Sequence, residues 1–367
     1  MYNRLYRRFS SVDIITLMCA FALSAISLYS LYMLGTGNTV GRLTEGATRH
    51  TALTQAVSVL IGLLAFIITV SLGQRIIRKL SPFAFAASLA LCVLTLTPLG
   101  VTVDDDKAWL SIGGISFQPS EVLKIGFIML GAYILSSGRS KKVRYSLFLA
   151  AAASGAAVIF LQRDMGTLVI FTLIVLCMLF CAGTSKRLWA FGILLSPAVI
   201  YAVWRFILNA DQRTRIISSL DPSADPYGAG YQQISAHNAI AGGGFTGRLF
   251  EQRGSMVYVA SAHNDFILSF IAQLFGSVGL FAVCILLSLL IIKSAPKGGG
   301  YLFYVRAGVF MFFASQAIIN TAMNLSLFPV VGITLPFVSA GGTSVVTAFS
   351  ALGLISLSDG YTENDYA

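Results

Sequence analysis

The chain has 367 residues, of which 56% are hydrophobic and only 11% charged, and its mean hydropathy is +0.80. Soluble domains average about 25% charged residues, so this composition excludes an ordinary soluble protein and predicts an all-α polytopic membrane protein. The bases behind the formal net charge of +10 cluster between apolar segments. There they indicate membrane topology and contact with anionic lipid, and we expect no nucleic-acid partner.

Apolar runs long enough to cross about 30 Å of hydrocarbon predict about ten transmembrane helices in one integral membrane domain over residues 1–367. The runs fall near residues 14–34, 54–73, 82–101, 119–137, 144–161, 166–183, 188–207, 265–292, 304–326 and 336–357. Lys and Arg residues concentrate at the N-terminus and in the connections after every second run. By the positive-inside rule we expect both termini in the cytoplasm and the polar loops outside.

The first run follows three arginines, as in a signal peptide. It is about 20 residues long and has no obvious small-residue cleavage site, so we expect a retained helix. All five cysteines lie in apolar runs without metal-ligand spacing. This placement favours packing residues over a disulfide or a metal site.

The outer connection at 102–118 carries three consecutive carboxylates, Asp104, Asp105 and Asp106, followed by Trp109. Adjacent carboxylates do not converge on one cation without a turn, so we favour a solvated loop over a metal site. Trp109 fits an anchor at the membrane interface.

Charged residues also occur inside or beside the middle spans. Glu121 and Lys124 are three residues apart, share a helix face and can form an ion pair. Such a pair either locks helices together or belongs to a ligand site in a cavity, and the sequence alone favours neither. Asp164 lies in a very short outer turn between the fifth and sixth spans and adds a carboxylate to the same layer.

The longest connection, 208–263, is expected as a large extracytoplasmic loop between spans seven and eight, and loops of this length are often functional. It contains Arg213, Arg215, Arg248 and the triple glycine 242–244. Glycines there can present backbone N–H groups to an anion, although a flexible turn is the commoner role. His237 and His263 are too isolated to indicate zinc.

Asp265 lies where this loop runs into a strongly apolar helix. A carboxylate at the mouth of a membrane helix is costly unless it is capped, paired or facing water. From position alone, we favour Asn264 or Asp265 as the helix cap over a catalytic role. Further on, two prolines and several glycines in 325–344 predict broken backbone buried in protein, with close helix packing as the alternative.

Six motifs in order resemble the SEDS family, the RodA/FtsW group of bacterial cell-wall polymerases. They are Gln118-Pro119-Ser120-Glu121 with Lys124, Gln162-x-Asp164-x-Gly166-Thr167, Tyr231-Gln232, Ala239-Ile240 with the triple glycine, His263-Asn264-Asp265-Phe266-Ile267, and Leu335-Pro336-Phe337-x-Ser339-x-Gly341-Gly342. The motifs run from residue 118 to 344, and the ten-span layout also agrees.

This resemblance implies a peptidoglycan glycosyltransferase, RodA-like because the termini are short, that polymerises lipid II outside the bacterial cytoplasmic membrane. It implies a class B penicillin-binding transpeptidase as partner and Asp265 as the catalytic residue. From the chemistry, we expect Asp265 to be the general base of an inverting displacement. The leaving diphosphate needs positive charge from Lys124, Arg213, Arg215 or Arg248, or from a divalent cation such as Mg²⁺ or Mn²⁺. Other expected substrate contacts are Glu121, Asp164, His263, Asn264 and Ser339.

Several positions depart from the family pattern. Ala108 replaces an Arg, and Lys107 beside it lacks the bidentate fork. Other departures are Ala260, Ser261, Gln273, Leu274, Ser326 and Ala340. These changes keep two alternatives open: a catalytically reduced scaffold for a transpeptidase, and a flippase or transporter of lipid-linked precursors, since intramembrane charges also mark transport paths.

Overall fold

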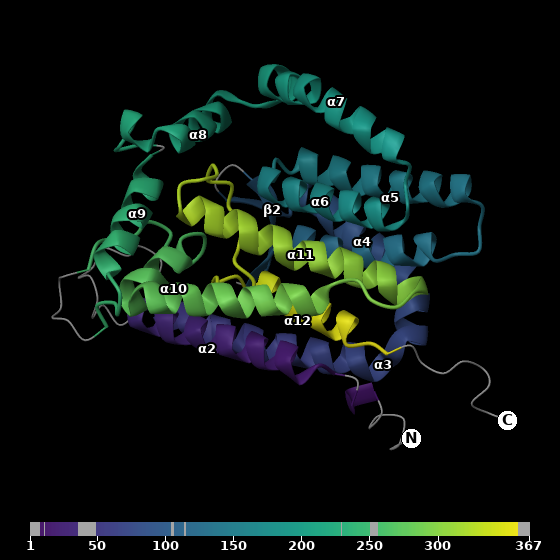
Figure 1. Cartoon of the computed structure of the whole chain (residues 1–367), viewed down its shortest axis with the longest axis horizontal. Coiled ribbons are helices and arrows are strands. Elements are labelled where there is room, and N and C mark those ends of the chain that lie inside the picture. The colour runs from purple at the N-terminus through teal and green to yellow at the C-terminus, as the bar shows by residue number, and fades with distance from the viewer. Residues whose placement is uncertain are drawn as a thin grey trace.

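The computed structural model describes residues 8–10, 12–35, 49–103, 106–113, 115–228, 230–249 and 256–358. Its long helices are α2 (Ile14–Gly35), α3 (Arg49–Thr95), α4 (Pro119–Leu135), α5 (Lys141–Leu161), α6 (Met165–Cys181), α7 (Lys186–Ala202), α10 (Ile267–Ser294), α11 (Gly300–Asn324) and α12 (Gly342–Ile355). Shorter helices are η1 (Val203–Ile207), α8 (Ala210–Leu220), η2 (Pro222–Ala224) and α9 (Tyr231–Gly243). Helices α2, α5, α6, α10 and α11 lie roughly along one direction in a bundle (Figure 1).

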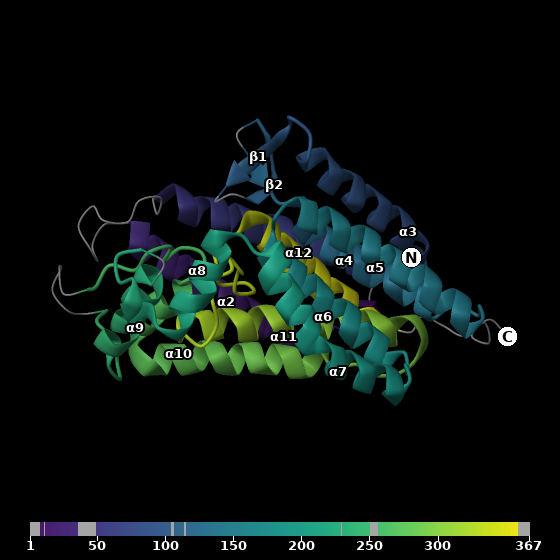
Figure 2. The same ribbon diagram turned by 90° about the horizontal axis from the view of Figure 1, so that it is seen from above.

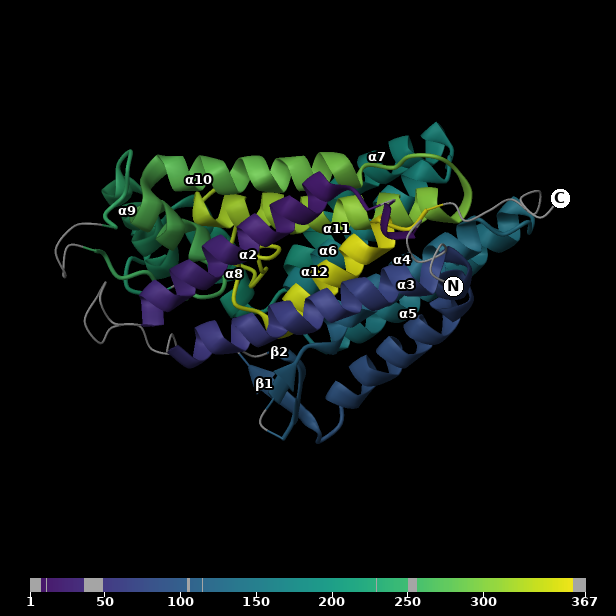
Figure 3. The same ribbon diagram turned by 90° about the horizontal axis from the view of Figure 1, so that it is seen from below.

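The described helices have the length and composition of a multi-pass membrane protein. Six of them, with the two arms of α3 counted together, are long and apolar enough to cross a membrane. Gly73 has non-helical angles (φ 73°, ψ 167°) and separates those two arms, which Figure 3 shows running in different directions. The arms contain the expected second span, 54–73, and residues 82–95 of the expected third span, 82–101. The total of ten spans stays a prediction.

The expected loop at 102–118 is wrong, because this stretch forms a three-stranded antiparallel sheet. Its strands are β1 (Gly100–Val103), β2 (Asp106–Ile112) and β3 (Ile115–Phe117), in the order β1-β2-β3. Ala108 and Leu110 are buried, whereas Trp109 between them pairs with Val101 on the other face. This alternation is the strand signal that the charged run obscured. Asp104 and Asp105 lie outside the described residues. The sheet sits on the flank of the bundle, beyond α3 (Figure 2).

The long connection at 208–263 contains helices where it is described, while its placement outside the membrane stays a prediction. Asn209 and Gln212 form a reciprocal capping box that starts α8. In Figure 1, α7 and α8 arch over the bundle at a distance. None of the described side chains of α7 is buried. By contrast, α9 packs against α10.

The glycines between α9 and α10 permit a close backbone contact. Gly276 (φ 68°) kinks α10, and Ser277 N–H donates to the Gly244 carbonyl at 3.0 Å. A Cβ atom on Gly247 would lie 2.2 Å from the Leu274 carbonyl oxygen. The Gly247 N–H itself donates to Gly243. The backbone of this segment therefore packs closely against α10. Residues 244–246 form a turn, and anion binding by the glycines stays a prediction.

Aromatic and small residues form the core. Phe127 of α4 contacts Phe85 of α3, Phe148 of α5 and Phe171 of α6, with ring centroids 6.2, 5.3 and 4.7 Å away. Such ring pairs add about 0.5–1.5 kcal/mol each beyond burial. Gly353 of α12 approaches the backbone of α3 at Phe66, in the small-residue packing typical of membrane helices.

Two contacts join helix ends in pairs at the end of the bundle where the short connection 295–299 links α10 to α11. Asp13, just before α2, pairs with Lys293 near the end of α10 at 2.9 Å. Arg306 of α11 donates to the Ile355 carbonyl at the end of α12 at 2.8 Å. Helices α2 and α12 thus begin and end at the same end of the bundle, as expected if both termini lie on one side of a membrane.

Candidate functional site

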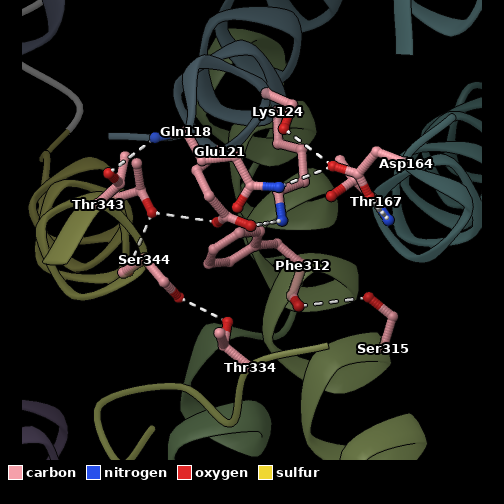
Figure 4. A network of polar contacts seen from close by, with 12 residues as sticks. Gln118, Glu121, Lys124, Asp164, Thr167, Phe312, Ser315, Thr334, Thr343 and Ser344 are labelled. Carbon is pink, nitrogen blue, oxygen red and sulfur yellow. Dashed lines mark hydrogen bonds and ion pairs between the residues drawn. The ribbon is translucent and has the colours of Figure 1, made fainter. Parts of the chain in front are cut away.

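Two polar clusters occupy the bundle, and the first surrounds the start of α4. Lys124 Nζ lies 2.7 Å from Glu121 Oε1, with side chains 0% and 6% exposed, and Figure 4 shows the two pointing toward each other. Lys124 also lies 5.3 Å from the centroid of the Phe312 ring. The predicted ion pair is confirmed. Its burial favours the helix-locking role over direct contact with a substrate.

Asp164 joins α4 to α6 in the same cluster. It is the N-cap of α6, accepting from the Thr167 N–H at 2.9 Å. It also accepts from Gln118 Nε2 at 2.7 Å and from Ser120 Oγ at 3.2 Å (Figure 4). These three donors satisfy a carboxylate that is 4% exposed, so the contacts favour a structural role for Asp164.

The second cluster holds the backbone of residues 263–265 at the start of α10. Three successive carbonyls accept hydrogen bonds from the α11–α12 region: His263 from Ala340 N–H at 2.8 Å, Asn264 from Ser339 Oγ at 2.7 Å, and Asp265 from two asparagine amides. All three side chains are half-buried. The backbone that carries Asp265 is therefore fixed from one side while its side chain keeps some access to the exterior.

The two asparagines are Asn320 and Asn324 of α11, which sequence reasoning missed as functional residues. Asn320 Nδ2 lies 2.9 Å and Asn324 Nδ2 lies 2.8 Å from the Asp265 carbonyl oxygen. Both residues are 0% exposed. Their spacing of four residues in an apolar span was the available signal, because buried polar residues on one helix face indicate a shared partner.

Asp265 does not occupy the N-cap position of α10. That position belongs to Phe266, and Asn324 Oδ1 accepts from the N–H of Ser269 in the first turn at 3.0 Å. A side chain from α11 thus supplies one acceptor for the helix end. The capping interpretation of Asn264 and Asp265 loses its main geometric support.

Residues 334–347 connect the two clusters. Ser339 is 1% exposed; its hydroxyl donates to Asn264 and accepts from the Leu335 N–H at 2.8 Å. Thr343 accepts from the Gln118 N–H at 3.1 Å (Figure 4). The broken backbone expected at 325–341 is present, and Phe337 within it is buried with φ 64°. Ser339 is committed to these internal contacts, which favour positioning over substrate contact.

The arginines expected near the diphosphate lie elsewhere in the fold. Arg213 and Arg215 are on α8, where Arg213 donates to the Arg205 carbonyl at 3.1 Å and Arg215 is exposed. The Arg248 guanidinium donates to the Gly242 carbonyl. The backbone N–H of Arg248 donates to the carbonyl of Gln273, which lies within α10. No hydrogen bond or ion pair described for Arg213 or Arg215 joins them to residues 263–265.

Two chemical properties of the site follow from burial. Burial lowers the pKa of His263, so this imidazole stays neutral at neutral pH. Within the described part of the chain, no group of three His, Cys, Asp or Glu side chains could hold a metal ion.

The family model for FtsW, RodA and SpoVE, described as a cell cycle protein, matches residues 10–363. The chain belongs to this family, the SEDS proteins. A SEDS relative named probable peptidoglycan glycosyltransferase FtsW, from Trichlorobacter lovleyi, is 30% identical over 364 residues, covering 95% of this chain and 93% of the relative.

Solved SEDS structures share the fold. A chain from a peptidoglycan synthase complex, described as coordinating polymerization and crosslinking, is 26% identical with a TM-score of 0.77, covering 94% of this chain and 97% of that one. RodA of Thermus thermophilus is 22% identical with a TM-score of 0.67, covering 94% and 96%. Because both FtsW and RodA occur among these proteins, the RodA branch stays a prediction.

The structure shows the environment of three residues that depart from the SEDS pattern. Ser326, where the family has glycine, adopts φ 57°, a conformation that favours glycine. Gln273 is fully buried, and its amide faces the backbone of Val257, with which one orientation forms two hydrogen bonds. Ala108 is completely buried in β2. None of these changes removes a residue that binds the carbonyl of Asp265.

Proposed function

We propose that this SEDS protein is a peptidoglycan glycosyltransferase that polymerises lipid II into β-1,4-linked glycan at the outer face of the bacterial cytoplasmic membrane. The observation that carries the proposal is Asp265, a half-buried carboxylate on backbone held by Asn320 and Asn324. The names of SEDS relatives support the reaction class. Cell-wall elongation, the RodA role, is part of the proposal.

In the proposed reaction, the 4-hydroxyl of the acceptor sugar attacks the anomeric carbon of the donor. The bond from that carbon to the diphosphate oxygen breaks, and the diphosphate leaves with the bonding electrons. Asp265 takes the hydroxyl proton, so one displacement converts the α-linked donor into a β-linked product. Removing this proton as the new bond forms raises the nucleophilicity of the hydroxyl.

Neighbours of Asp265 suit a sugar substrate. Asn264 Oδ1 is buried and has no hydrogen-bond partner among the described residues. A buried acceptor without a partner costs about 1–3 kcal/mol, which a substrate hydroxyl or amide would recover. His263, neutral because burial lowers its pKa, adds no positive charge that would weaken Asp265 as a base.

The charge on the leaving diphosphate needs a counter-charge. We propose that a divalent cation, Mg²⁺ or Mn²⁺, would supply this counter-charge, because metal ions stabilise charge that develops on a leaving group. Arg213 and Arg215 on α8 and Arg248 beside α10 are the cations expected for this role on the same long connection. Arg215, which is exposed, would reach the diphosphate only if α8 approached the bundle.

The proposal includes a partner and an orientation. A SEDS protein solved within a peptidoglycan synthase complex supports assembly with a class B penicillin-binding transpeptidase. The distribution of Lys and Arg supports cytoplasmic termini. This orientation places Asp265 on the side where lipid II is presented for polymerisation.

The test is polymerisation of labelled lipid II by the purified full-length chain with its class B transpeptidase and Mg²⁺, followed on gels that resolve glycan length. We expect wild type to form long glycan and Asp265→Ala to form none. Asp221→Asn changes an exposed carboxylate outside the site and serves as the matched control.

The outcomes separate the three candidate functions. Glycan from wild type and from Asp221→Asn, but not from Asp265→Ala, supports the polymerase. No glycan from a folded wild-type complex contradicts it and favours the scaffold. Lipid II translocation across vesicles without glycan favours the flippase.

A further inference from the structure

The amide of Asn324 connects two parts of the site at once. Its Nδ2 donates to the Asp265 carbonyl at 2.8 Å, while its Oδ1 accepts from Ser269 N–H at 3.0 Å and Ser269 Oγ at 2.6 Å. The amide nitrogen therefore binds the backbone of Asp265, and the amide oxygen binds the first turn of α10.

Asn320 completes the contact one helical turn earlier. Its Nδ2 lies 2.9 Å from the Asp265 carbonyl and 2.7 Å from the Ile333 carbonyl. Asn324 Nδ2 also lies 2.9 Å from the Asn320 backbone carbonyl. The backbone carbonyl oxygen of Asp265 thus accepts hydrogen bonds from two side chains of α11 that are four residues apart.

The two donor side chains are fully buried. Asn320 and Asn324 are 0% exposed, and buried polar groups of a membrane protein must find partners within the protein. If either amide were lost, the Asp265 carbonyl would have one donor fewer. The peptide group of Asp265 is thereby held against α11 by a rigid helix.

We propose that Asn320 and Asn324 are positioning residues that fix the Asp265 carboxylate for proton abstraction. This inference rests on the proposed function, because it assigns the asparagines a role through Asp265. Neither asparagine touches the reacting atoms. A general base must lie within hydrogen-bond reach of the proton it removes, and a misplacement of about 1 Å can lower the rate about 100-fold.

A purely structural role for these asparagines makes a different prediction. If they only held α11 to α10, variants would lose folded protein, while the molecules that remained folded would turn over at the normal rate. A positioning role instead predicts folded protein whose kcat falls and whose KM for lipid II changes little.

The experiment measures kcat and KM for lipid II polymerisation by the wild-type complex with its transpeptidase and by Asn320→Leu and Asn324→Leu complexes. Only protein that elutes as a single folded complex is assayed. We expect kcat to fall about 10- to 100-fold in each variant with KM within about threefold. Gln316→Leu is the matched control, because Gln316 is buried one turn earlier on α11 and its amide has no partner among the described residues.

Two further variants distinguish the donor contact of Asn324 from its acceptor contacts. Asn324→Asp keeps an acceptor for Ser269 and removes the amide donor to the Asp265 carbonyl. An unpaired carboxylate buried at this position costs stability, so only folded complexes are assayed, and we expect them to have a reduced kcat. Ser269→Ala removes one contact on the acceptor face and leaves both donors to Asp265, so we expect kcat within about threefold of wild type. These variants keep the test decisive where a leucine variant fails to fold.

Normal kcat in folded Asn324→Asp, or in either leucine variant, would overturn the inference. So would an equal loss of kcat in Ser269→Ala and Asn324→Asp, because a damaged helix end would then explain both. Asp265→Asn in the same assay isolates the proposed function: if it stays active, Asp265 is not the base, whatever the asparagine variants do.

Discussion

The ammonium nitrogen of Lys124 lies 2.7 Å from a carboxylate oxygen of Glu121, in a place where both side chains are almost entirely buried. Glu121 Oε2 also lies 3.5 Å from the hydroxyl of Thr347 on α12, and the ammonium lies over the Phe312 ring of α11. The pair therefore links α4 with α11 and α12, the two helices on either side of the segment 325–341. Desolvated charges of this kind are stable only as a pair.

Removing one charge of this pair should destabilise the protein strongly. Lys124→Met leaves a buried carboxylate without its cation, and such losses are about 3–5 kcal/mol. The double variant Glu121→Leu with Lys124→Met should recover most of that loss, because no charge then remains buried. Thermal unfolding in detergent, followed by fluorescence-detected size exclusion, measures both effects.

Lys142→Met, at the exposed start of α5, is the control for removing a lysine and should unfold within about 0.5 kcal/mol of wild type. A single Lys124→Met variant as stable as wild type would contradict the helix-locking account. If the double variant regains stability but not polymerisation, the pair has a second role in the reaction.

Close backbone packing at the kink of α10 predicts different costs for two glycines with positive φ. Gly244 (φ 57°) has open space around a would-be Cβ, whereas on Gly247 (φ 81°) that atom meets the Leu274 carbonyl at 2.2 Å. Gly244→Ala should cost only backbone strain, about 1–2 kcal/mol. Gly247→Ala should cost about 1–3 kcal/mol more through overpacking. Equal unfolding temperatures for the two variants would contradict the close contact.

Burial of His263 predicts a dependence of stability on pH. Its folded-state pKa lies below the ordinary value, so between the two values the unfolded chain binds more protons, and stability falls as pH is lowered. The penalty is absent above the ordinary pKa, about 6.5, and complete below the folded-state value.

We therefore expect His263→Gln to lose less thermal stability than wild type between pH 7.5 and pH 5.5. Exposed His237 on α9 supplies the control variant, His237→Gln, which should follow wild type. If His263→Gln and wild type decline in parallel, protonation of His263 does not contribute to the acid sensitivity.

The proposed cation should depend on the substrate. Because the described residues contain no cluster of three metal-ligating side chains, we expect Mg²⁺ or Mn²⁺ to bind weakly to the purified complex alone. Chelation should abolish polymerisation, and either ion should restore it through the diphosphate. Titration calorimetry that finds tight Mg²⁺ binding without lipid II would contradict this account.

Much of the bundle could be predicted from the sequence because apolar runs of sufficient length leave few alternatives to helices. The Glu121–Lys124 pair followed from helical spacing, and Asp265 stood out as a carboxylate at a helix mouth. Local patterns carried these features, so no knowledge of distant contacts was required.

Features that depend on contacts between distant segments were missed. The strands at 100–117 are short and interrupted by charge, so their pairing was hidden. The hydrogen bonds from Asn320 and Asn324 to the Asp265 carbonyl join residues that are 55 and 59 positions apart, respectively. Ser339 was expected at the substrate, but its hydrogen bonds to Asn264 and Leu335 depend on how residues 325–341 fold back.

The most direct test of the account is the rate at which Asp265→Asn polymerises lipid II, compared with wild type under saturating substrate. The substitution keeps the size and hydrogen-bonding shape of the side chain and removes its ability to take a proton. If Asp265 is the general base, we expect a rate about 100- to 10,000-fold lower, with lipid II binding retained. A rate within a few-fold of wild type would show that the carboxylate is not the base and would contradict the central claim.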